Sequence, residues 1–417
     1  MQKLLLRLAF FCLLFSFCAD AQRSPYVTPK IRTVVQGRLI SPGSPPFHLV
    51  ATLTKADVPF GRIEMHWLAP DKWRRVIDTP YFKQTKIVNG ERIFEQNSWD
   101  YFPLAVETLI IAMVDPDPII AAVREGDRVS TKSNGDANES GVTCYDKFNK
   151  LCFKDKNGLR EIVAASGHAV DFSQYEKFHS MRIAREISNA GRLGETRLTL
   201  KIMRLEDLKK PDEMLFHIES PTPPEKQLKT MQLDEIALRH QLIGPAEIIW
   251  PQPLDGQQTG PASFYISTDQ AGRVREVQQL YTVNERTNDS AKSQLQKWTF
   301  KPLVRNGVPL QMQGVLSFTL DTRAYGPKEP LSDVEARKLA TYTRDCGIPA
   351  GKYPAGTTYD LWIAVDSEGR LIEVMTGKGP HELFSPCYDA LKQWKFSPLM
   401  QNGKALPYRA NIVFTMP

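Results

Sequence analysis

A repeat in the last part of the chain constrains its fold more than any single residue does. The residues that recur at an offset of 96 are Trp298 and Trp394, Phe300 and Phe396, Pro302 and Pro398, Asn306-Gly307 and Asn402-Gly403, and Phe318-Thr319 and Phe414-Thr415. Those that recur at an offset of 97 are Asp269 and Asp366, Gly272-Arg273 and Gly369-Arg370, and Glu276-Val277 and Glu373-Val374. One small module has therefore been copied, and no residue shared by the copies has the pattern of a catalytic group.

Length and charge limit the remaining possibilities. The chain has 417 residues, which predicts two to four domains of roughly 100–200 residues each. The net charge of +6 is mild and its basic residues are scattered. Nucleic-acid binding needs a concentrated basic surface, so we expect no nucleic-acid partner.

Residues 1–21 have the pattern of a secretory signal peptide. Two basic residues precede the apolar run Leu8–Phe17, and Ala19–Ala21 supplies the small residues that signal peptidase requires, which would make Gln22 the mature start. The run is shorter than the roughly 20 apolar residues of a membrane-spanning helix, and no later segment is long enough. We therefore expect a soluble mature protein in an oxidising compartment. Whether Cys18 carries lipid stays open.

Four cysteines remain after the predicted cleavage: Cys144, Cys152, Cys346 and Cys387. Pairing of near neighbours, 144 with 152 and 346 with 387, is the simplest of the three possible connectivities. A reactive dithiol at 144 and 152 is disfavoured, because such pairs usually sit two residues apart at a helix start. The chain has no C-x-x-C or H-E-x-x-H spacing, so we expect no metal site.

The first domain, residues 30–218, has the pattern of a curved antiparallel sheet. Ile63, Met65 and Trp67 alternate with polar residues, which predicts a strand with one buried face. Asn89-Gly90 between two apolar runs predicts a type I′ hairpin. The run Leu104–Met113 is apolar on too many sides for a half-exposed strand, and it predicts a helix that covers the sheet. Asp115-Pro116-Asp117-Pro118 then marks a helix boundary or a turn.

Two stretches of this domain resemble LolA-like lipoprotein carriers. Trp67–Arg74, with the sequence WLAPDKWR, is similar to the "aPdkwR" stretch of that family, and Leu198–Leu208 followed by Glu213–Phe216 is similar to its last strand and terminal phrase. The resemblance implies an open half-barrel whose concave apolar face holds acyl chains. The side chains it assigns to that ligand face are Ile63, Met65 and Trp67. The alternative is that this face is simply the core beneath the helix.

A proline-rich segment, residues 219–232, separates this domain from the repeats, and its prolines predict a short stiff linker. The copies occupy residues 245–322 and 346–417, and each has the pattern strand, turn, strand, helix, strand. The chain as a whole is therefore predicted to be mainly β, with a half-barrel under one helix followed by two small two-layer ββαβ domains.

Comparison of the copies bears on the last two cysteines. The first copy has Ala291 where the second has Cys387, and Cys346 has no cysteine counterpart either. Two cysteines that occur together in one copy predict a bond between them. The alternative is a buried free thiol at Cys387.

The repeat resembles the C-terminal domain of TonB. That family has a D-x-x-G turn, then "A…W.F.P….G", then a final strand ending in phenylalanine, which corresponds here to residues 269–318 and 366–414. The resemblance implies binding of an extended segment of an outer-membrane or envelope partner by strand addition at a sheet edge. The residues it assigns to that edge are Tyr353, Pro354, Tyr408, Ala410, Ile412 and Phe414. The signature tryptophan, phenylalanine and proline are predicted to be core residues.

No enzyme signature occurs in the chain. It lacks G-x-S-x-G, G-x-G-x-x-G and P-loop spacings, so we expect neither a catalytic residue nor a cofactor. The interpretation is a periplasmic, non-enzymatic binding protein whose terminal modules bind an extended segment of a partner in a transport-related role. The alternative is a lipid or lipoprotein carrier that uses the first domain, with the modules as docking adaptors. A purely structural role is a third possibility.

Overall fold

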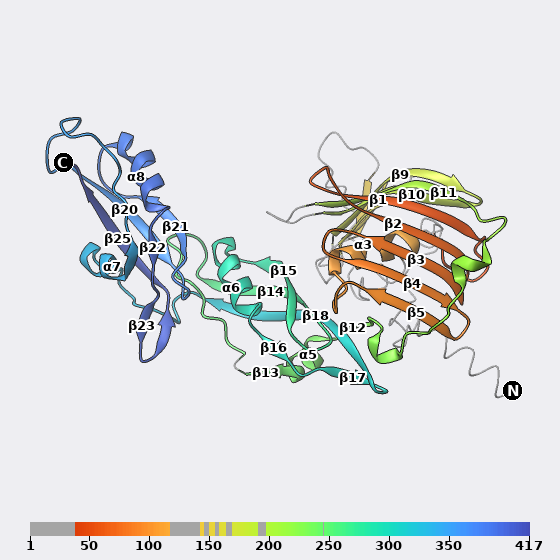
Figure 1. The fold of residues 1–417 in the computed structure, drawn as a ribbon. Coiled ribbons are helices and arrows are strands. Elements are labelled where there is room, and N and C mark those ends of the chain that lie inside the picture. Colours follow the sequence, from red (N-terminus) through yellow and green to blue (C-terminus); the bar gives the residue numbers. More distant parts are fainter. Residues whose placement is uncertain are drawn as a thin grey trace. The chain divides into compact units, whose positions relative to one another are not determined.

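The computed structural model describes residues 38–116, 142–145, 150–154, 158–163, 169–190, 197–244 and 246–417. The predicted signal peptide therefore lies outside the described residues. The chain divides into two units (Figure 1). The first holds the described residues up to Asp234 together with Ser267–Gly272 and Lys301–Gly314, and the second holds Glu235–Ile266, Arg273–Phe300 and Val315–Pro417.

The first unit is built on an open sheet of eleven strands in the order β5-β4-β3-β2-β1-β11-β10-β9-β8-β7-β6 (Figure 1). The strands are β1 Phe47–Lys55, β2 Val58–Ala69, β3 Lys72–Asp78, β4 Lys83–Asn89, β5 Arg92–Asn97, β6 Val142–Tyr145, β7 Lys150–Lys154, β8 Gly158–Val163, β9 Ala169–Phe178, β10 Met181–Ala190 and β11 Leu198–Asp207. Every neighbouring pair is antiparallel. The predicted open antiparallel sheet is confirmed.

Local sequence explains the β4–β5 hairpin and the buried face of β2. A hairpin joins β4 to β5 where it is predicted, with Asn89 opposite Arg92. Of the loop residues only Gly90 has a positive φ, of +61°, so the turn is not the predicted type I′, which needs positive φ at both central residues. Along β2, Ile63, Met65 and Trp67 are 0%, 4% and 3% exposed, as the alternation of apolar and polar residues predicts.

One helix, α3 (Leu104–Val114), covers the inner face of the sheet, as the sequence predicts. Eight of its residues are buried, and they point to all sides of the helix, so it packs as an internal element. The helix ends at Asp115, whose backbone is extended, because the residue before a proline disfavours the helical conformation. Within the described residues, no helix is long and apolar enough to cross a membrane.

The proline-rich segment 219–232 lies along the outermost strand, β5. Thr222 N–H donates to the Ile93 carbonyl at 2.7 Å, and the Thr222 hydroxyl bonds both the N–H and the carbonyl of Glu95. The Leu228 N–H donates to the Glu95 carboxylate at 3.0 Å. The segment predicted as a linker thus covers main-chain groups that an edge strand otherwise exposes.

The chain then builds the first copy of the repeat. Its elements are β12 Thr230–Gln232, α5 Glu235–Gln241, β13 Leu242–Ile243, β14 Thr259–Thr268, β15 Val274–Thr282, η3 Glu285–Thr287, α6 Asn288–Leu295, β16 Thr299–Phe300, β17 Leu303–Arg305 and β18 Val308–Asp321. The sheet order is β12-β18-β14-β15, with β17 paired to β18. Strands β14 and β18 run through both units.

The second copy repeats this order. Its elements are α7 Asp333–Leu339, β19 Ala340–Tyr342, β20 Thr358–Val365, β21 Leu371–Thr376, η4 His381–Leu383, α8 Phe384–Leu391, β22 Lys395–Phe396, β23 Leu399–Gln401, β24 Lys404–Leu406 and β25 Tyr408–Thr415. Its central sheet is β21-β20-β25. Phe300, Trp394, Phe396 and Phe414 are buried, whereas Trp298, Phe318 and Pro398 are half-buried and Pro302 is exposed, so the prediction that the signature residues are core residues holds only in part. Trp394 packs edge-to-face on Phe414 and Trp298 on Phe318. The TonB resemblance itself stays a prediction.

The Asp-x-x-Gly turn shows why the repeat keeps its glycine. Gly369 N–H donates to the Asp366 carbonyl at 3.0 Å, and Gly369 has φ +79°. A Cβ at this position would lie 2.4 Å from the Phe396 carbonyl oxygen. Any other residue would therefore clash with the strand that carries the aromatic signature.

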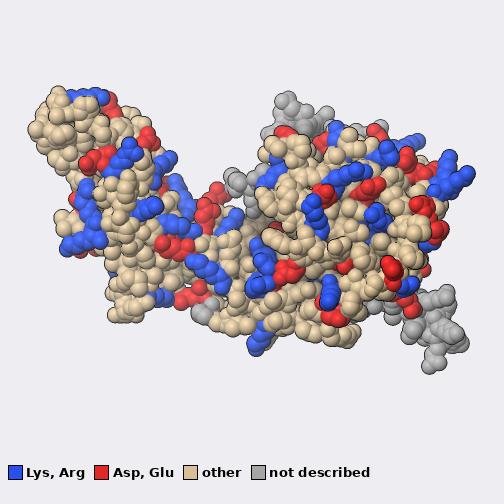
Figure 2. All heavy atoms as spheres, viewed as in Figure 1, with Lys and Arg blue, Asp and Glu red and all other residues tan. Residues whose placement is uncertain are grey.

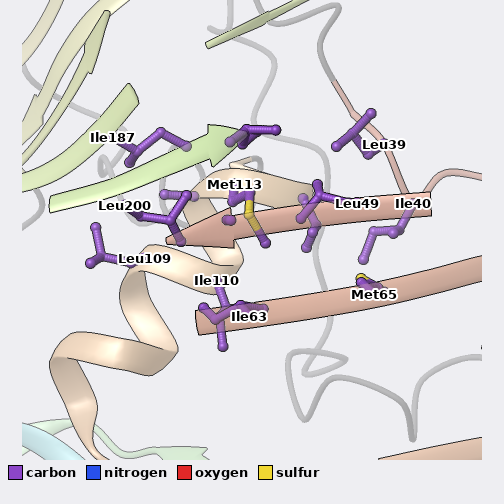
Figure 3. Close-up of a cluster of buried hydrophobic side chains, with 14 of the residues drawn as sticks. Leu39, Ile40, Leu49, Ile63, Met65, Leu109, Ile110, Met113, Ile187 and Leu200 are labelled. Atoms are coloured by element: carbon purple, nitrogen blue, oxygen red, sulfur yellow. The ribbon is translucent and has the colours of Figure 1, made fainter. Parts of the chain in front are cut away.

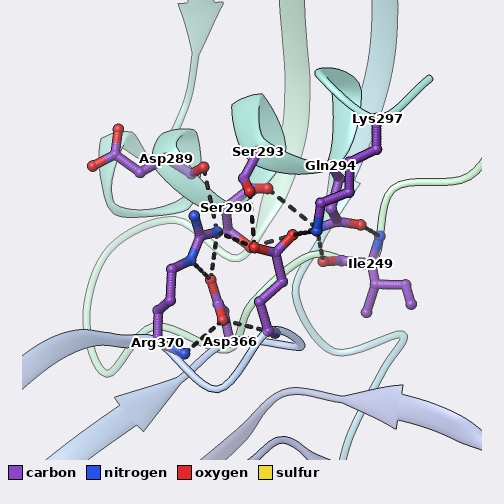
Figure 4. A network of polar contacts seen from close by, with 9 residues as sticks. Ile249, Asp289, Ser290, Ser293, Gln294, Lys297, Asp366 and Arg370 are labelled. Atoms are coloured by element: carbon purple, nitrogen blue, oxygen red, sulfur yellow. Dashed lines mark hydrogen bonds and ion pairs between the residues drawn. The ribbon is translucent and has the colours of Figure 1, made fainter. Parts of the chain in front are cut away.

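Polar contacts join the two copies within the second unit (Figure 4). The Glu368 carboxylate accepts hydrogen bonds from Ser293 and Lys297 of the first copy, both at 2.8 Å. Arg286 forms an ion pair with Glu373 at 2.7 Å. On the face that Figure 2 shows, basic and acidic side chains are intermixed.

Cys346 and Cys387 form a disulfide. Cys387 is fully buried on α8, which confirms the bond that the comparison of copies predicted. Cys144 and Cys152 are register partners on β6 and β7. Their side chains lie outside the described residues, so a bond between them stays a prediction.

Candidate functional site

The inner face of the eleven-stranded sheet has an apolar half, formed by β1, β2, β10 and β11. Its side chains are almost fully buried, and they are Leu49, Ala51, Leu53, Ile63, Met65, Trp67, Ile187, Leu200 and Ile202. Figure 3 shows Leu109, Ile110 and Met113 of α3 among these side chains. In the observed state the predicted ligand face is therefore the core beneath the helix. Binding of an acyl chain at Ile63, Met65 and Trp67 requires α3 to move, and this role stays a prediction.

Polar contacts tether α3 near its two ends. At the C-terminal end, Arg38 donates two hydrogen bonds of 3.0 Å to the Asp115 carboxylate, and Leu39 N–H donates to the Val114 carbonyl at 2.9 Å. Just before the helix begins, the Gln311 side-chain amide exchanges two hydrogen bonds of 2.9 Å with the backbone of Phe102.

One residue within α3 extends the N-terminal tether. The Glu107 carboxylate accepts from the Thr230 hydroxyl at 2.8 Å and from the Gln313 amide at 2.9 Å. The helix is thus held near its ends by directional contacts, while its middle is held by apolar packing, which is non-directional.

The other half of the inner face, on β3, β4 and β5, carries polar side chains beside the buried Trp73, Ile77 and Val88, and we call it the polar half. Arg75 donates to the Gln84 amide oxygen at 2.6 Å, and Gln84 donates in turn to Asn97 at 2.8 Å. The Arg75 guanidinium also lies 5.5 Å from the centre of the Phe102 ring. Burial lowers the pKa of Arg75 to about 10, although the carboxylates of Glu95 and Glu107 oppose this shift.

An ion pair completes the polar half. Lys86 Nζ lies 2.8 Å from Glu95 Oε2, and the Glu95 side chain is fully buried. An open cleft of about 370 Å³ lies at the ends of β3, β4 and β5, with Ile77, Gln84 and Asn97 among its lining residues. The inner face therefore offers apolar packing on one side and hydrogen-bonding groups beside an opening on the other.

The side chains predicted to bind a partner lie in the core of the second copy. Tyr408, Ala410 and Ile412 are fully buried and Phe414 is 3% exposed. Tyr353 packs on the same cluster while half-buried, and the Pro354 carbonyl accepts hydrogen bonds from Thr357. Any strand addition to β25 therefore depends on its main-chain groups.

Those main-chain groups are already bonded within the chain. On the outer edge of β25, the Arg409 carbonyl accepts from Leu331 N–H, and Asn411 N–H donates to the Leu331 carbonyl. The Val413 N–H donates to Asp333 Oδ1 at 3.0 Å, and its carbonyl accepts from Arg337 at 2.7 Å. In this state the edge has no room for a partner strand, and partner binding there stays a prediction.

The first copy covers the edge of its last strand, β18, in the same way. Glu235 accepts from Ser317 N–H at 3.0 Å, and Arg239 donates to the Ser317 carbonyl. Each acid also pairs with its own arginine one helical turn later. We call the pairs Glu235–Arg239 and Asp333–Arg337 the edge clamps. The repeat pattern does not predict them, because they lie upstream of the predicted module boundaries.

A group of metal-type ligands was also missed. Among the described residues, His48, Glu64 and His66 place three such side chains together. Their spacing along the chain matches no metal motif, because they come from two paired strands. The sequence signal that could have predicted this group is that His48 and His66 fall on the outer faces of neighbouring strands.

No protein-family model matches the chain, and no curated protein matches it. Among solved structures, a LolA superfamily protein from Nitrosomonas europaea is similar over 45% of this chain and 97% of its own, at 12% identity and a TM-score of 0.28. A domain from Vibrio parahaemolyticus, named for outer-membrane lipoprotein sorting, is similar over 41% and 88%, at 11% identity and a TM-score of 0.24.

A DUF1329 family protein from Desulfovibrio piger is similar over 41% of this chain and 89% of its own, at 9% identity and a TM-score of 0.24. Likenesses at this level transfer no function to the chain. Two of these three structures bear the name of LolA or of lipoprotein sorting, and none of the three bears the name of TonB.

Proposed function

We propose that this protein is a non-enzymatic periplasmic carrier that binds the acyl chains of a lipid or lipoprotein on the inner face of its eleven-stranded sheet. The observation that carries the proposal is that α3, buried on all sides, fills the concave side of the sheet over its apolar half. A segment packed in this way occupies the space that an apolar ligand needs.

The energetics favour an exchange between helix and ligand. Burial of apolar surface contributes about 25 cal/mol per Å², or about 0.8 kcal/mol per methylene, whatever covers that surface. An acyl chain that replaces α3 against Leu49, Ile63 and Leu200 keeps those side chains out of water. The exchange must break the tethers at Asp115 and Phe102, and it needs a new cover for the apolar side chains of α3, because eight residues of the helix are buried.

The polar half of the inner face supplies the second element of the proposal. A lipid or lipoprotein has a polar part joined to its acyl chains. Arg75, Gln84 and Asn97 offer hydrogen-bond donors and acceptors next to the apolar half and beside the cleft. Buried polar groups of this kind fix the orientation of a ligand within an apolar site.

The two C-terminal modules act as docking adaptors in this proposal. Strand addition by an envelope partner at β25 is the route that the TonB resemblance implies. It requires the segment Leu331–Arg337 to leave the edge that it occupies. Partner docking at β25 is therefore the second candidate function, after ligand binding.

The proposal is tested with a fluorescent fatty acid and the chain from Gln22 onward. Asp115→Asn removes the ion pair with Arg38 that tethers the end of α3. We expect it to bind the probe roughly tenfold more tightly than the parent, because the helix then competes less well by about the strength of one charged hydrogen bond. The control is Asp171→Asn, which breaks an ion pair with Arg197 in the same sheet, away from the cleft.

Lipid extraction of the freshly purified parent completes the test. We expect co-purified acyl lipid, together with unchanged probe affinity in the control. Absence of acyl lipid from the extract, with no probe binding by the parent or by Asp115→Asn, would show that the inner face is only a core.

A further inference from the structure

We propose that the outer face of the first unit binds one transition-metal ion, of the Zn²⁺ or Cu²⁺ class, through His48, Glu64 and His66. The sheet register brings these residues together. His48 on β1 is the direct register partner of His66 on β2. Glu64 precedes His66 by two residues, so both side chains emerge on the same face of the strand.

The distances fit a site that closes around an ion. His48 Nε2 lies 2.9 Å and His66 Nε2 lies 4.0 Å from Glu64 Oε1. One ligand atom from each of the three residues lies within 4.8 Å of the other two. Zinc ligands lie about 2.0–2.2 Å from the metal, which places them roughly 3.4 Å from each other in a tetrahedral site. The His48 and His66 rings are stacked with their planes 11° apart, so both rings must turn about their side-chain bonds before their nitrogens point at one ion.

One ring nitrogen of His66 lacks a partner. The residue is 8% exposed, and its Nδ1 has no hydrogen-bond partner in the described part of the chain. This is unusual for a buried polar atom, and it leaves that nitrogen without a competing hydrogen bond.

A second carboxylate orients the other histidine. His48 Nδ1 lies 3.4 Å from Glu206 Oε1 on β11. A metal-bound histidine commonly donates its other ring N–H to a carboxylate, which fixes the tautomer and the ring orientation.

The surroundings also select the class of ion. Arg62 lies 3.2 Å from the second oxygen of Glu64, and Arg204 lies 3.7 Å from Glu206. These arginines repel every divalent cation alike, so the choice of ion depends on the histidine ligands. Two imidazole ligands favour Zn²⁺, Cu²⁺ or Ni²⁺ over Ca²⁺ and Mg²⁺. Two histidines and one glutamate leave the fourth position of a zinc ion open to water or an external ligand.

Isothermal titration with ZnCl₂ tests the site on the chain from Gln22 onward. We expect one ion per chain for the parent, and affinity that falls more than roughly tenfold in His48→Gln and in His66→Gln. The matched control is His179→Gln, because His179 is an exposed histidine in the turn between β9 and β10, where it pairs with Asp207. It should bind zinc as the parent does, and MgCl₂ should give no binding to any variant.

Circular dichroism melting of each variant separates loss of a ligand from loss of the fold. Zinc should raise the melting temperature of the parent and of His179→Gln, and leave that of His48→Gln unchanged. Zinc binding by folded His48→Gln and His66→Gln at parental affinity would overturn the proposal. Absence of zinc binding by the parent would overturn it equally.

Discussion

At the scale of single residues, a buried charge controls how the first unit responds to acid. The Glu95 carboxylate is fully buried, pairs with Lys86, and accepts hydrogen bonds from Asn97 and from Leu228 N–H. Burial raises its pKa, but the pair with Lys86 and these hydrogen bonds outweigh burial and hold the pKa below the ordinary value of 4.5. The stability that Glu95 contributes is therefore present above pH 4.5 and is lost as the pH falls through its lowered pKa.

Glu95→Gln tests this response. At pH 7 it leaves Lys86 with no buried counter-charge at this position, so we expect the free energy of unfolding to fall by about 3–5 kcal/mol. The difference between parent and variant should shrink below pH 4.5, because the parent then loses the same ion pair. Urea unfolding at a series of pH values measures both effects. An equal difference at pH 7 and at pH 3 would contradict the assignment.

Local alternation predicts whether a side chain is buried when that depends on its own strand alone. It fails when burial depends on a side chain of a neighbouring strand. Alternation placed Ile63, Met65 and Trp67 on the buried face. The same logic placed His66 on the solvent face, yet it is 8% exposed because its ring stacks on His48, with ring centres 4.2 Å apart. Register between strands is invisible in local periodicity, so neither this pair nor the Lys86–Glu95 pair could be predicted.

At the scale of elements, each copy of the repeat protects its own sheet edge. In an edge clamp, one acid and one arginine on a short helix bond the N–H and the carbonyl of a single strand residue, as a neighbouring strand would. In the second copy that residue is Val413. Exposed strand edges promote unwanted pairing, and the presence of a clamp in both copies indicates that edge protection belongs to the module.

Removal of the second clamp tests its role. In Asp333→Ala/Arg337→Ala, the hydrogen bonds to Val413 are lost while the core residue Ala336 is retained. Hydrogen bonds to charged groups contribute about 1.5–3 kcal/mol, so we expect the Val413 amide to exchange with solvent roughly tenfold faster or more. Hydrogen–deuterium exchange of β25 measures this rate.

Lys338→Ala is the control for the clamp variant, because it changes an exposed residue of the same helix. It should leave the exchange of β25 unchanged. Equal exchange of Val413 in the parent and the clamp variant would show that the clamp does not protect the edge.

The repeat itself was visible in sequence because its core residues are large, rare and evenly spaced. Its clamps were not, for two reasons. The match of Glu235 and Arg239 to Asp333 and Arg337 falls at an offset of 98, whereas the aromatic signature repeats at 96. An acid followed four residues later by an arginine is also common on any exposed helix.

At the scale of the whole molecule, the sequence predicted the open antiparallel sheet and its covering helix, but not how the parts of the first unit are tied together. Residues far apart along the chain supply those ties. Gln311 bonds Phe102, Thr222 bonds Glu95, and Gln313 bonds Glu107. A proline-rich stretch predicts an extended backbone, but main-chain pairing with a distant edge strand leaves no pattern in side chains.

The central claim, that α3 gives way to an acyl chain, is tested most directly by hydrogen–deuterium exchange of Leu104–Val114 with and without a saturating fatty acid. If the acyl chain displaces α3, the ligand increases hydrogen exchange of the α3 amides. The amides of β1 and β2 stay protected, because these strands remain paired. Binding of the fatty acid with unchanged protection of the α3 amides would contradict displacement of α3.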